Sequence, residues 1–336
     1  MQKVIVEAFG GVDRLHLAAL PDPCPTGQQV LVRLTSIGMN HADLMARRGE
    51  YRLSSGEPPF TPGLEGGGYI EAVGPAVHDR HVGQRVLLSL DAPVHPEGRV
   101  GTYGTHYLTS AAQTVIAPDA LPDQLLGALW LAYLTAWSCL IWRQGLRAGQ
   151  VVLLPAASSS VAIAAAQIVR HHGGVAIGTT TSALKCEKLR AMGESAYAHI
   201  VCTSERQWRK QVKKLTDNGV VDVVFDPVGA GPLLQSAIHL LAQGGTIWIY
   251  GLLGKPDVLD VTPLIRKRAA LRGWLLDELS ALGSEPVQRA YQHVLDRFAD
   301  GTYALPIAGI FPLRDVREAH ARMEQGAHIG KFILVP

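Results

Sequence analysis

Residues 151–180 read VVLLPAASSSVAIAAAQIVRHHGGVAIGTT, and this stretch decides the fold class. An apolar run at 151–154 precedes an Ala- and Ile-rich helical stretch at about 160–171, and a second apolar run follows at 175–180. Apolar strands that alternate with helices form right-handed βαβ units, whose strands lie parallel and are covered on both faces. Because this alternation continues to about residue 271, the sequence predicts an α/β fold with a parallel sheet.

A third unit of this segment begins at Ile200. Shortly after it, Ser204 and Gln207 have the spacing of a capping box, in which the two side chains satisfy backbone N–H groups at a helix start. This pair predicts a helix over residues 205–215.

The segments on either side have a different rhythm. Short β-type runs separated by Gly and Pro occur at 3–7, 29–37, 68–73, 85–88 and 114–116, which predicts a small, mostly β domain of barrel type. The last segment combines helices at 286–298 and 315–325 with strands at 308–311 and 331–335, a content that suits a return to the first domain. We therefore expect three segments: 1–122, the α/β segment 123–271, and 272–336.

Length and charge limit the class of protein. A chain of 336 residues predicts about two domains. Its 31 Lys and Arg residues nearly balance its 29 Asp and Glu residues, without the basic excess typical of a nucleic-acid binder. We therefore expect a small-molecule substrate and no nucleic-acid partner.

Targeting and redox signals are equally plain. The N-terminal residues lack the apolar core of a signal peptide, and the apolar run at 151–169 is interrupted by Pro155 and three serines. The four cysteines form no CxxC pair, which favours reduced thiols over disulfides. We expect a cytoplasmic protein without a membrane partner.

The turn after the first apolar strand has the position and length of a dinucleotide-binding loop. Residues 155–162 read PAASSSVA, and Ala157, Ser159 and Ala162 replace the glycines of the GxGxxG pattern. These small side chains leave room for the backbone to approach a pyrophosphate, and helix N-terminal amides favour an anion. An ordinary helix cap made of serines is the alternative, and the sequence leaves both open.

The end of the second strand bears on the choice of cofactor. An adenosine ribose with a free 2′-hydroxyl usually meets an Asp or Glu there, but here no acid precedes Glu187. The hydroxyls of Thr180 and Thr181 and the amine of Lys185 suit a 2′-phosphate instead. The sequence therefore favours NADP(H) over NAD(H), although Lys185 could equally be a solvated side chain.

Several motifs together resemble the medium-chain dehydrogenase/reductase superfamily, in particular its zinc-independent quinone oxidoreductase branch. They follow one another along nearly the whole chain: GMNHAD at 38–43, RRG at 47–49, PFTPGLEGGG at 59–68, GQRV at 83–86, TAW at 135–137, FDPVG at 225–229 and GK at 330–331. The resemblance implies a GroES-like substrate domain built from both chain ends, a Rossmann domain inserted between them, an active site in the interdomain cleft, and a homodimer.

The resemblance also implies site residues. The candidate catalytic residues are Asn40, for positioning, and Tyr51, as proton donor or partner of the substrate oxygen. Tyr51 is chosen for its place just past RRG at 47–49, and a surface aromatic is its alternative. The residues expected at NADPH are Asn40, Thr135, Ser158, Ser159, Ser160, Val161, Thr180, Thr181, Lys185, Tyr250, Gly251, Trp274, Leu275 and Lys331.

No metal is expected. Zinc-dependent relatives carry Cys where this chain has Asn40 and His where it has Leu64, and neither Asn nor Leu is a tetrahedral zinc ligand. Glu65 and His41 alone do not complete a site.

Without a Lewis acid, a substrate that accepts hydride readily is favoured, which means a quinone or an α,β-unsaturated carbonyl compound. Two alternatives stay open. A dinucleotide-binding sensor or scaffold without catalysis would fit the glycine-free loop, and an enoyl-thioester reductase would use the same chemistry on another substrate.

Overall fold

The computed structural model describes residues 1–51, 56–91, 94–95, 98–192 and 196–336. It divides into two compact units, one made of Met1–Leu131 with Tyr291–Pro336 (unit 1) and the other of Ala132–Ala290 (unit 2). The expected insertion of one unit into the other is therefore present. The sequence placed the boundaries at 122 and 271, whereas the structure divides the chain after Leu131 and after Ala290.

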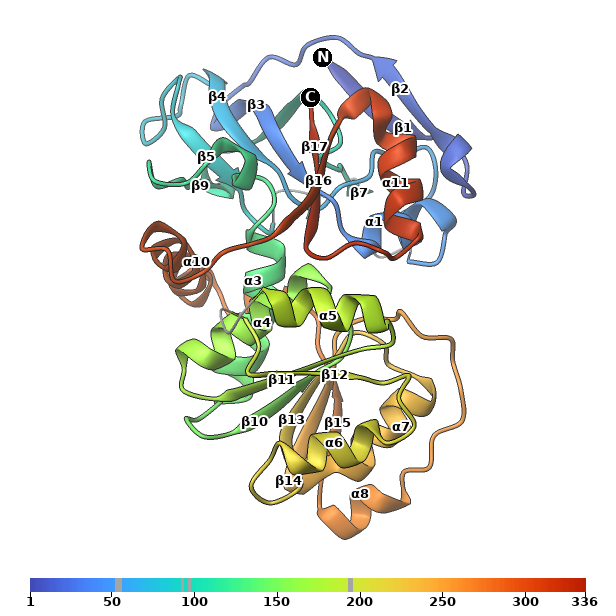
Figure 1. The fold of residues 1–336 in the computed structure, drawn as a ribbon. Helices are drawn as coiled ribbons and strands as arrows, with labels where there is room; N and C mark the ends of the chain where they lie inside the picture. The colour runs from blue at the N-terminus through green and yellow to red at the C-terminus, as the bar shows by residue number, and fades with distance from the viewer. Residues whose placement is uncertain (52–55, 92–93, 96–97, 193–195) are drawn as a thin grey trace. The chain divides into compact units, whose positions relative to one another are not determined.

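Unit 2 is built on one parallel sheet of six strands (Figure 1). Its order is β12-β11-β10-β13-β14-β15, which is the doubly wound Rossmann order with its switch point between β10 and β13. The strands are β10 (Val151–Leu154), β11 (Val175–Thr180), β12 (His199–Cys202), β13 (Val221–Asp226), β14 (Leu241–Ile249) and β15 (Ala270–Gly273). The predicted fold class is confirmed.

Helices cover both faces of this sheet, with α4 and α5 on one face and α6 and α7 on the other (Figure 1). The helices of the crossovers are α4 (Ser160–His171), α5 (Ala183–Ala191), α6 (Trp208–Lys214), α7 (Gly231–Leu240) and α8 (Thr262–Lys267). Helix α4 is buried along most of its length, as its Ala- and Ile-rich sequence requires. Further helices are α3 (Trp130–Trp137), which continues into a π-helical turn at Ser138–Arg143, α9 (Asp277–Ser280) and α10 (Ser284–Ala299).

The capping-box prediction at Ser204 is wrong. Helix α6 begins at Trp208, and Gln207 is its N-cap. The Ser204 hydroxyl lies 3.0 Å from the thiol of Cys202 instead. Because that hydroxyl is engaged with the end of β12, the chain makes a further turn before the helix starts.

Unit 1 contains a sheet of seven strands with the order β16-β17-β3-β4-β5-β9, and β8 pairs with β3 beside this path. These strands are β3 (Gln29–Gly38), β4 (Gly67–Val73), β5 (Arg85–Leu88), β8 (His106–Ser110), β9 (Thr114–Ile116), β16 (Ile307–Pro312) and β17 (Lys331–Val335). Two small hairpins add β1 (Gln2–Val6) with β2 (Leu15–Ala19), and β6 (Val94–His95) with β7 (Gly98–Arg99). Its helices are α1 (His41–Arg48) and α11 (Val316–Glu324).

The C-terminal strand joins the two ends of the chain. Strand β17 runs antiparallel to β3 and pairs Ile333 with Gly38 and Leu334 with Ile37. The return of the last segment to the first domain, which the sequence led us to expect, thus places Lys331 near the end of β3. This pairing builds the polar network described below.

Candidate functional site

The loop after β10, residues 155–162, is called the serine loop here. Its Ala156 has a φ of +52°, in the left-handed region that glycine occupies at little cost. Both backbone polar groups of the next residue, Ala157, are hydrogen-bonded. Its N–H donates to Thr179 O (2.9 Å), and its carbonyl oxygen accepts from the Tyr197 hydroxyl (2.7 Å). The loop backbone is therefore held to the neighbouring strand without a glycine.

The serines of the loop have separate tasks. Ser159 is the N-cap of α4, because its hydroxyl accepts a hydrogen bond from the Ala162 N–H (3.2 Å). The helix-cap interpretation is thus confirmed for this serine. Ser160 and Val161 form the first turn of α4 and are half-buried, so backbone N–H groups at a helix N-terminus lie at the carboxyl end of β10. That arrangement is suited to a phosphate group.

Lys185 reaches this loop from the second crossover. Its Nζ donates to the Ser158 hydroxyl at 2.8 Å, so Lys185 is not merely a solvated side chain of α5. Burial lowers the pKa of its amine. Thr180, at the end of β11, is buried, while Thr181 is exposed. A cation and hydroxyl groups therefore surround the carboxyl ends of β10 and β11.

The end of β14 adds Tyr250 to the same edge. Burial raises the pKa of its hydroxyl, and the Ser159 hydroxyl beside it acts in the opposite direction. The Tyr250 ring stacks on Phe225 of β13 with centroids 4.0 Å apart. At the next residue, Gly251, a Cβ atom would lie 2.7 Å from Pro227 O, so only glycine allows this close approach.

Three other predicted cofactor residues lie outside the serine loop. Trp274 follows the end of β15, and its N–H donates to Ile249 O at the end of β14 (2.8 Å). Trp274 is buried, and its ring packs against Trp142 and Trp248 in the core of unit 2. Leu275 is 45% exposed, and Thr135 is half-buried within α3. Their assignment to the cofactor stays a prediction.

Unit 1 holds a second group of predicted residues. Asn40 is the N-cap of α1, and its N–H donates to the Asp43 carboxylate (2.8 Å). The Asn40 side chain donates to Gly38 O (3.2 Å) and to Glu65 Oε1 (3.1 Å). Tyr51 follows the end of this helix and is half-buried.

Lys331 completes this group. Its Nζ donates to Asn40 Oδ1 (2.6 Å) and forms an ion pair with the Glu65 carboxylate. The other Glu65 oxygen accepts from the Leu131 N–H (3.0 Å). The sequence placed Lys331 at the cofactor, but its side chain is 1% exposed and lies among protein groups. Sequence reasoning missed this pair because 266 residues separate its members.

The Asp43 carboxyl group, which accepts from the Asn40 N–H, has a shifted pKa. Burial raises its pKa to about 7, against the opposing effects of the Asn40 N–H, Lys331 and the Tyr103 hydroxyl. Tyr103 donates to the same carboxylate at 3.1 Å. The folded protein therefore holds a proton on this carboxyl group up to a higher pH than an ordinary Asp would allow.

The residues around Asn40 do not fit a zinc ion. Asn40 and Leu64 stand where thiolate and imidazole ligands would be needed, and both oxygens of Glu65 are already bound by Lys331, Asn40 and the Leu131 amide. Across the described ranges, no three His, Cys, Asp or Glu side chains gather as a metal site would require.

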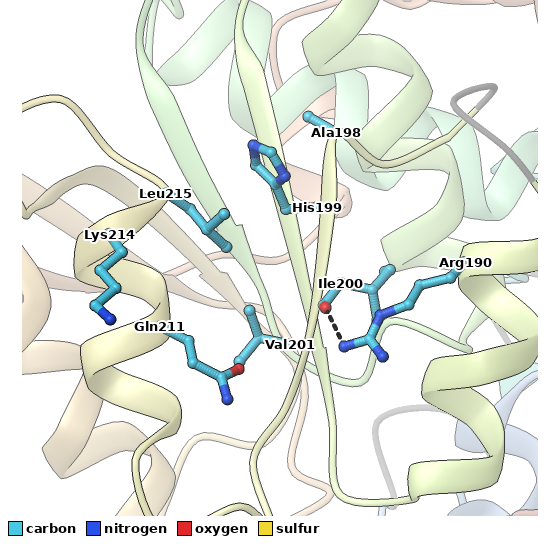
Figure 2. Close-up of a pocket in the computed structure, with 8 residues that line it drawn as sticks. All are labelled: Arg190, Ala198, His199, Ile200, Val201, Gln211, Lys214 and Leu215. Atoms are coloured by element: carbon cyan, nitrogen blue, oxygen red, sulfur yellow. Dashed lines mark hydrogen bonds between the residues drawn. The ribbon is translucent and has the colours of Figure 1, made fainter.

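Unit 2 also has a surface hollow of about 470 Å³ that sequence reasoning did not predict (Figure 2). It lies along the edge strand β12, between α5 and α6, and is lined by Arg190, Ala198, His199, Ile200, Val201, Gln211, Lys214 and Leu215. The Arg190 guanidinium donates to Ile200 O within it (2.9 Å). None of the predicted site residues lines this hollow, so it is separate from the serine loop.

None of the helices in the described part of the chain combines the length and the apolar character that crossing a bilayer requires.

Comparison with known proteins shows two family models in sequence order. An alcohol dehydrogenase GroES-like domain matches residues 26–120, and a zinc-binding dehydrogenase domain matches residues 160–299. Among curated proteins, the rat synaptic vesicle membrane protein VAT-1 homolog is 32% identical over 99% of this chain and 83% of its own length. A 2-haloacrylate reductase from a Burkholderia species is 29% identical over 99% of this chain and 98% of its own.

Solved structures agree with this placement. An NAD-dependent alcohol dehydrogenase has a TM-score of 0.87 at 28% identity and covers 100% of both chains. The quinone oxidoreductase of Pseudomonas syringae has a TM-score of 0.86 at 26% identity, over 100% of this chain and 99% of its own. A mycobacterial protein complexed with NADPH also reaches 0.86 at 26% identity, over 100% of both chains. The chain therefore belongs to the medium-chain dehydrogenase/reductase superfamily of oxidoreductases.

Proposed function

We propose that this protein transfers a hydride from NADPH to a quinone or an α,β-unsaturated carbonyl compound without a metal ion. The observation that carries the proposal is the engagement of Glu65 by Lys331, Asn40 and the Leu131 amide. A carboxylate bound in this way, beside an Asn and a Leu in place of Cys and His, offers no ligand set for zinc. The family model that matches unit 2 describes zinc-binding dehydrogenases, but the residues of this chain do not fit that ion.

The serine loop and Lys185 support a nicotinamide dinucleotide as cofactor, and NADPH in particular. The backbone N–H groups at the start of α4 would hold the pyrophosphate, and Lys185 with the Thr181 hydroxyl would hold the 2′-phosphate. When bound, NADPH supplies the hydride. The relative solved with NADPH supports this choice, whereas the similar NAD-dependent alcohol dehydrogenase shows that the same fold also uses NAD.

The substrate class follows from the lack of a Lewis acid. A quinone or enone spreads the incoming charge over a conjugated system, so orientation and a few hydrogen bonds suffice to stabilise it. The name of the similar 2-haloacrylate reductase also describes a substrate with an activated carbon–carbon double bond. Tyr51 is the proposed proton donor to the developing oxygen. A half-buried phenol just after α1 is suited to that task.

The test is turnover by chelator-treated protein. NADPH and NADH are each mixed with a panel of small quinones and enones, and nicotinamide oxidation is followed against a blank without protein. The proposal expects turnover that the chelator does not reduce and that is faster with NADPH. No turnover with any member of the panel would contradict it.

A catalytically inactive dinucleotide sensor is the second candidate, and two observations favour it. The serine loop contains no glycine, and one similar protein is named as a vesicle membrane protein rather than as an enzyme. Tight NADPH binding without hydride transfer in the same assay would favour this candidate, and measurable turnover would eliminate it.

The expected homodimer and the expected cytoplasmic location remain predictions. Light scattering on the purified protein measures the first, and the distribution of a fluorescently tagged chain in cells measures the second.

A further inference from the structure

We infer that Lys331 and Glu65 are positioning residues that fix the Asn40 side-chain amide, so that it accepts one hydrogen bond from a ligand hydroxyl group and donates none. This inference rests on the proposed function, because it assigns Asn40 a role toward the cofactor or the substrate. It also has a readout that needs neither ligand.

Both hydrogens of the Asn40 amide are already used. A side-chain amide NH₂ has two donors. Nδ2 directs them to Gly38 O at 3.2 Å and to Glu65 Oε1 at 3.1 Å. Asn40 therefore has no hydrogen left for the carbonyl oxygen of a quinone or enone.

One acceptor position remains. An amide oxygen has two lone pairs, and Asn40 Oδ1 uses one of them for Lys331 Nζ at 2.6 Å. The nearby Asp43 N–H, in the first turn of α1, donates to the main-chain oxygen of Asn40 (3.0 Å). A ligand group that meets Oδ1 must therefore be a donor, and a ribose hydroxyl of a nicotinamide cofactor or a hydroxyl of a reduced quinone is such a donor.

The charges of Lys331 and Glu65 fix which way the amide points. Turning it over would face the NH₂ group toward an ammonium and the oxygen toward a carboxylate, so both hydrogen bonds would become repulsive contacts. Neutral neighbours would accept either orientation. The ion pair thus selects one of two orientations that have nearly the same shape.

Burial makes this selection effective. Lys331 is 1% and Glu65 0% exposed, so water cannot substitute for either partner. Asn40 is 9% exposed and is the least buried of the three. It is thus the member of the network best placed to meet a ligand.

The hydroxyl could come from a ribose of NADPH or from the reduced product, and binding measurements distinguish the two sources. A ribose contact changes the Kd of NADPH measured without substrate. A product contact leaves that Kd unchanged and raises the inhibition constant of added hydroquinone. Either result supports an acceptor role for Asn40.

The central variant is Lys331→Met combined with Glu65→Gln, which removes both charges while keeping similar side-chain sizes. The double variant avoids a lone buried charge, and its thermal unfolding verifies that it is folded. Because the introduced glutamine amide pairs with either orientation of Asn40, we expect at least a tenfold increase in the NADPH Kd or in the inhibition constant of hydroquinone. Arg47→Met is the matched control, since Arg47 is an equally buried cation of unit 1 that pairs with Glu324 and not with Asn40.

The ligand-free readout is hydrogen exchange of the Asn40 side-chain amide, identified in NMR spectra by its absence from Asn40→Asp. We expect slow exchange in the natural protein and at least tenfold faster exchange in the folded double variant. Unchanged exchange, or a folded double variant with the natural NADPH Kd and the natural inhibition constant of hydroquinone, would overturn the inference. Failure of the natural protein to bind NADPH would contradict the proposed function alone, because the exchange measurement would still decide the role of Lys331 and Glu65.

Discussion

The serine loop of unit 2 and the Lys331–Glu65–Asn40 network of unit 1 both bring polar side chains together, but they differ in burial. Ser159 and Lys185 are half-buried, and their side chains bond to the Ala162 N–H and to the Ser158 hydroxyl. In the network, each carboxylate oxygen of Glu65 has a partner, and water has almost no access. Changes in the loop should therefore appear in ligand affinity, and changes in the network should appear first in stability.

The largest expected effect is the loss of the Glu65 charge alone. Glu65→Leu leaves the Lys331 ammonium buried without a counter-charge, which is expected to lower the free energy of unfolding by about 3–5 kcal/mol. Urea unfolding measures this loss. Glu71→Leu is the control, because Glu71 pairs with Arg33 on the surface, where an ion pair contributes about 0–1 kcal/mol. Equal losses of unfolding free energy in the two variants would show that the buried ion pair stabilises the fold no more than the surface pair does.

The second prediction concerns the pH dependence of stability through Asp43. Its pKa is about 7 in the folded protein, above that of an unfolded Asp, so the folded state holds the proton more tightly. As the pH rises from about 4 to 7, the unfolded chain loses that proton first, and the natural protein should lose stability relative to Asp43→Asn. The expected change is on the order of 1 kcal/mol per pH unit and ends above pH 7.

Urea unfolding of both proteins at several pH values measures this difference. Burial lowers the pKa of His320 to about 3, and its titration is present in both proteins, so it cancels. A difference that does not vary with pH would show that Asp43 is ionised in the folded state.

The third prediction concerns the serine loop. Ser159→Leu adds bulk where the backbone should approach a pyrophosphate, and we expect the Kd of NADPH to rise about tenfold or more, equivalent to about 1.4 kcal/mol. Ser159→Gly is the matched control, because glycine is a tolerated N-cap and adds no bulk. Titration by NADPH fluorescence measures both. An unchanged Kd in Ser159→Leu would mean that the pyrophosphate binds elsewhere.

The smallest expected effect is on cofactor choice. Lys185→Ala removes the amine beside Ser158, and we expect NADPH affinity to fall by about threefold to tenfold, typical of one partly exposed charge contact. NADH affinity should change less, because NADH lacks the 2′-phosphate. Lys188→Ala, an exposed lysine of the same helix α5, is the control. Equal losses for both cofactors would place Lys185 at the pyrophosphate rather than at the 2′-phosphate.

The two regions also differ in how far the sequence predicts them. Strands β10 and β11 and helix α4 were predicted with the bounds that they have, because strands and helices buried on all sides have uninterrupted apolar sequences. The contact between Lys185 and Ser158 follows from the same pattern, since both residues lie after neighbouring parallel strands.

In unit 1 the sequence was less informative. Helix α1 was not predicted, because charged residues that are buried in the structure, such as Asp43 and Arg47, interrupt its short sequence. The role of Lys331 depends on the pairing of β17 with β3, which joins residues from opposite ends of the chain. Local patterns do not contain such pairings, so the ion pair appeared only in the structure.

The most direct test of the central proposal is the rate of NADPH oxidation by chelator-treated protein in the presence of benzoquinone, with the uncatalysed rate subtracted. The proposal predicts a protein-dependent rate that saturates with NADPH and is unchanged by the chelator. A rate that disappears on chelation and returns with added zinc would contradict it, and so would the absence of any protein-dependent rate with benzoquinone and with the enones of the panel.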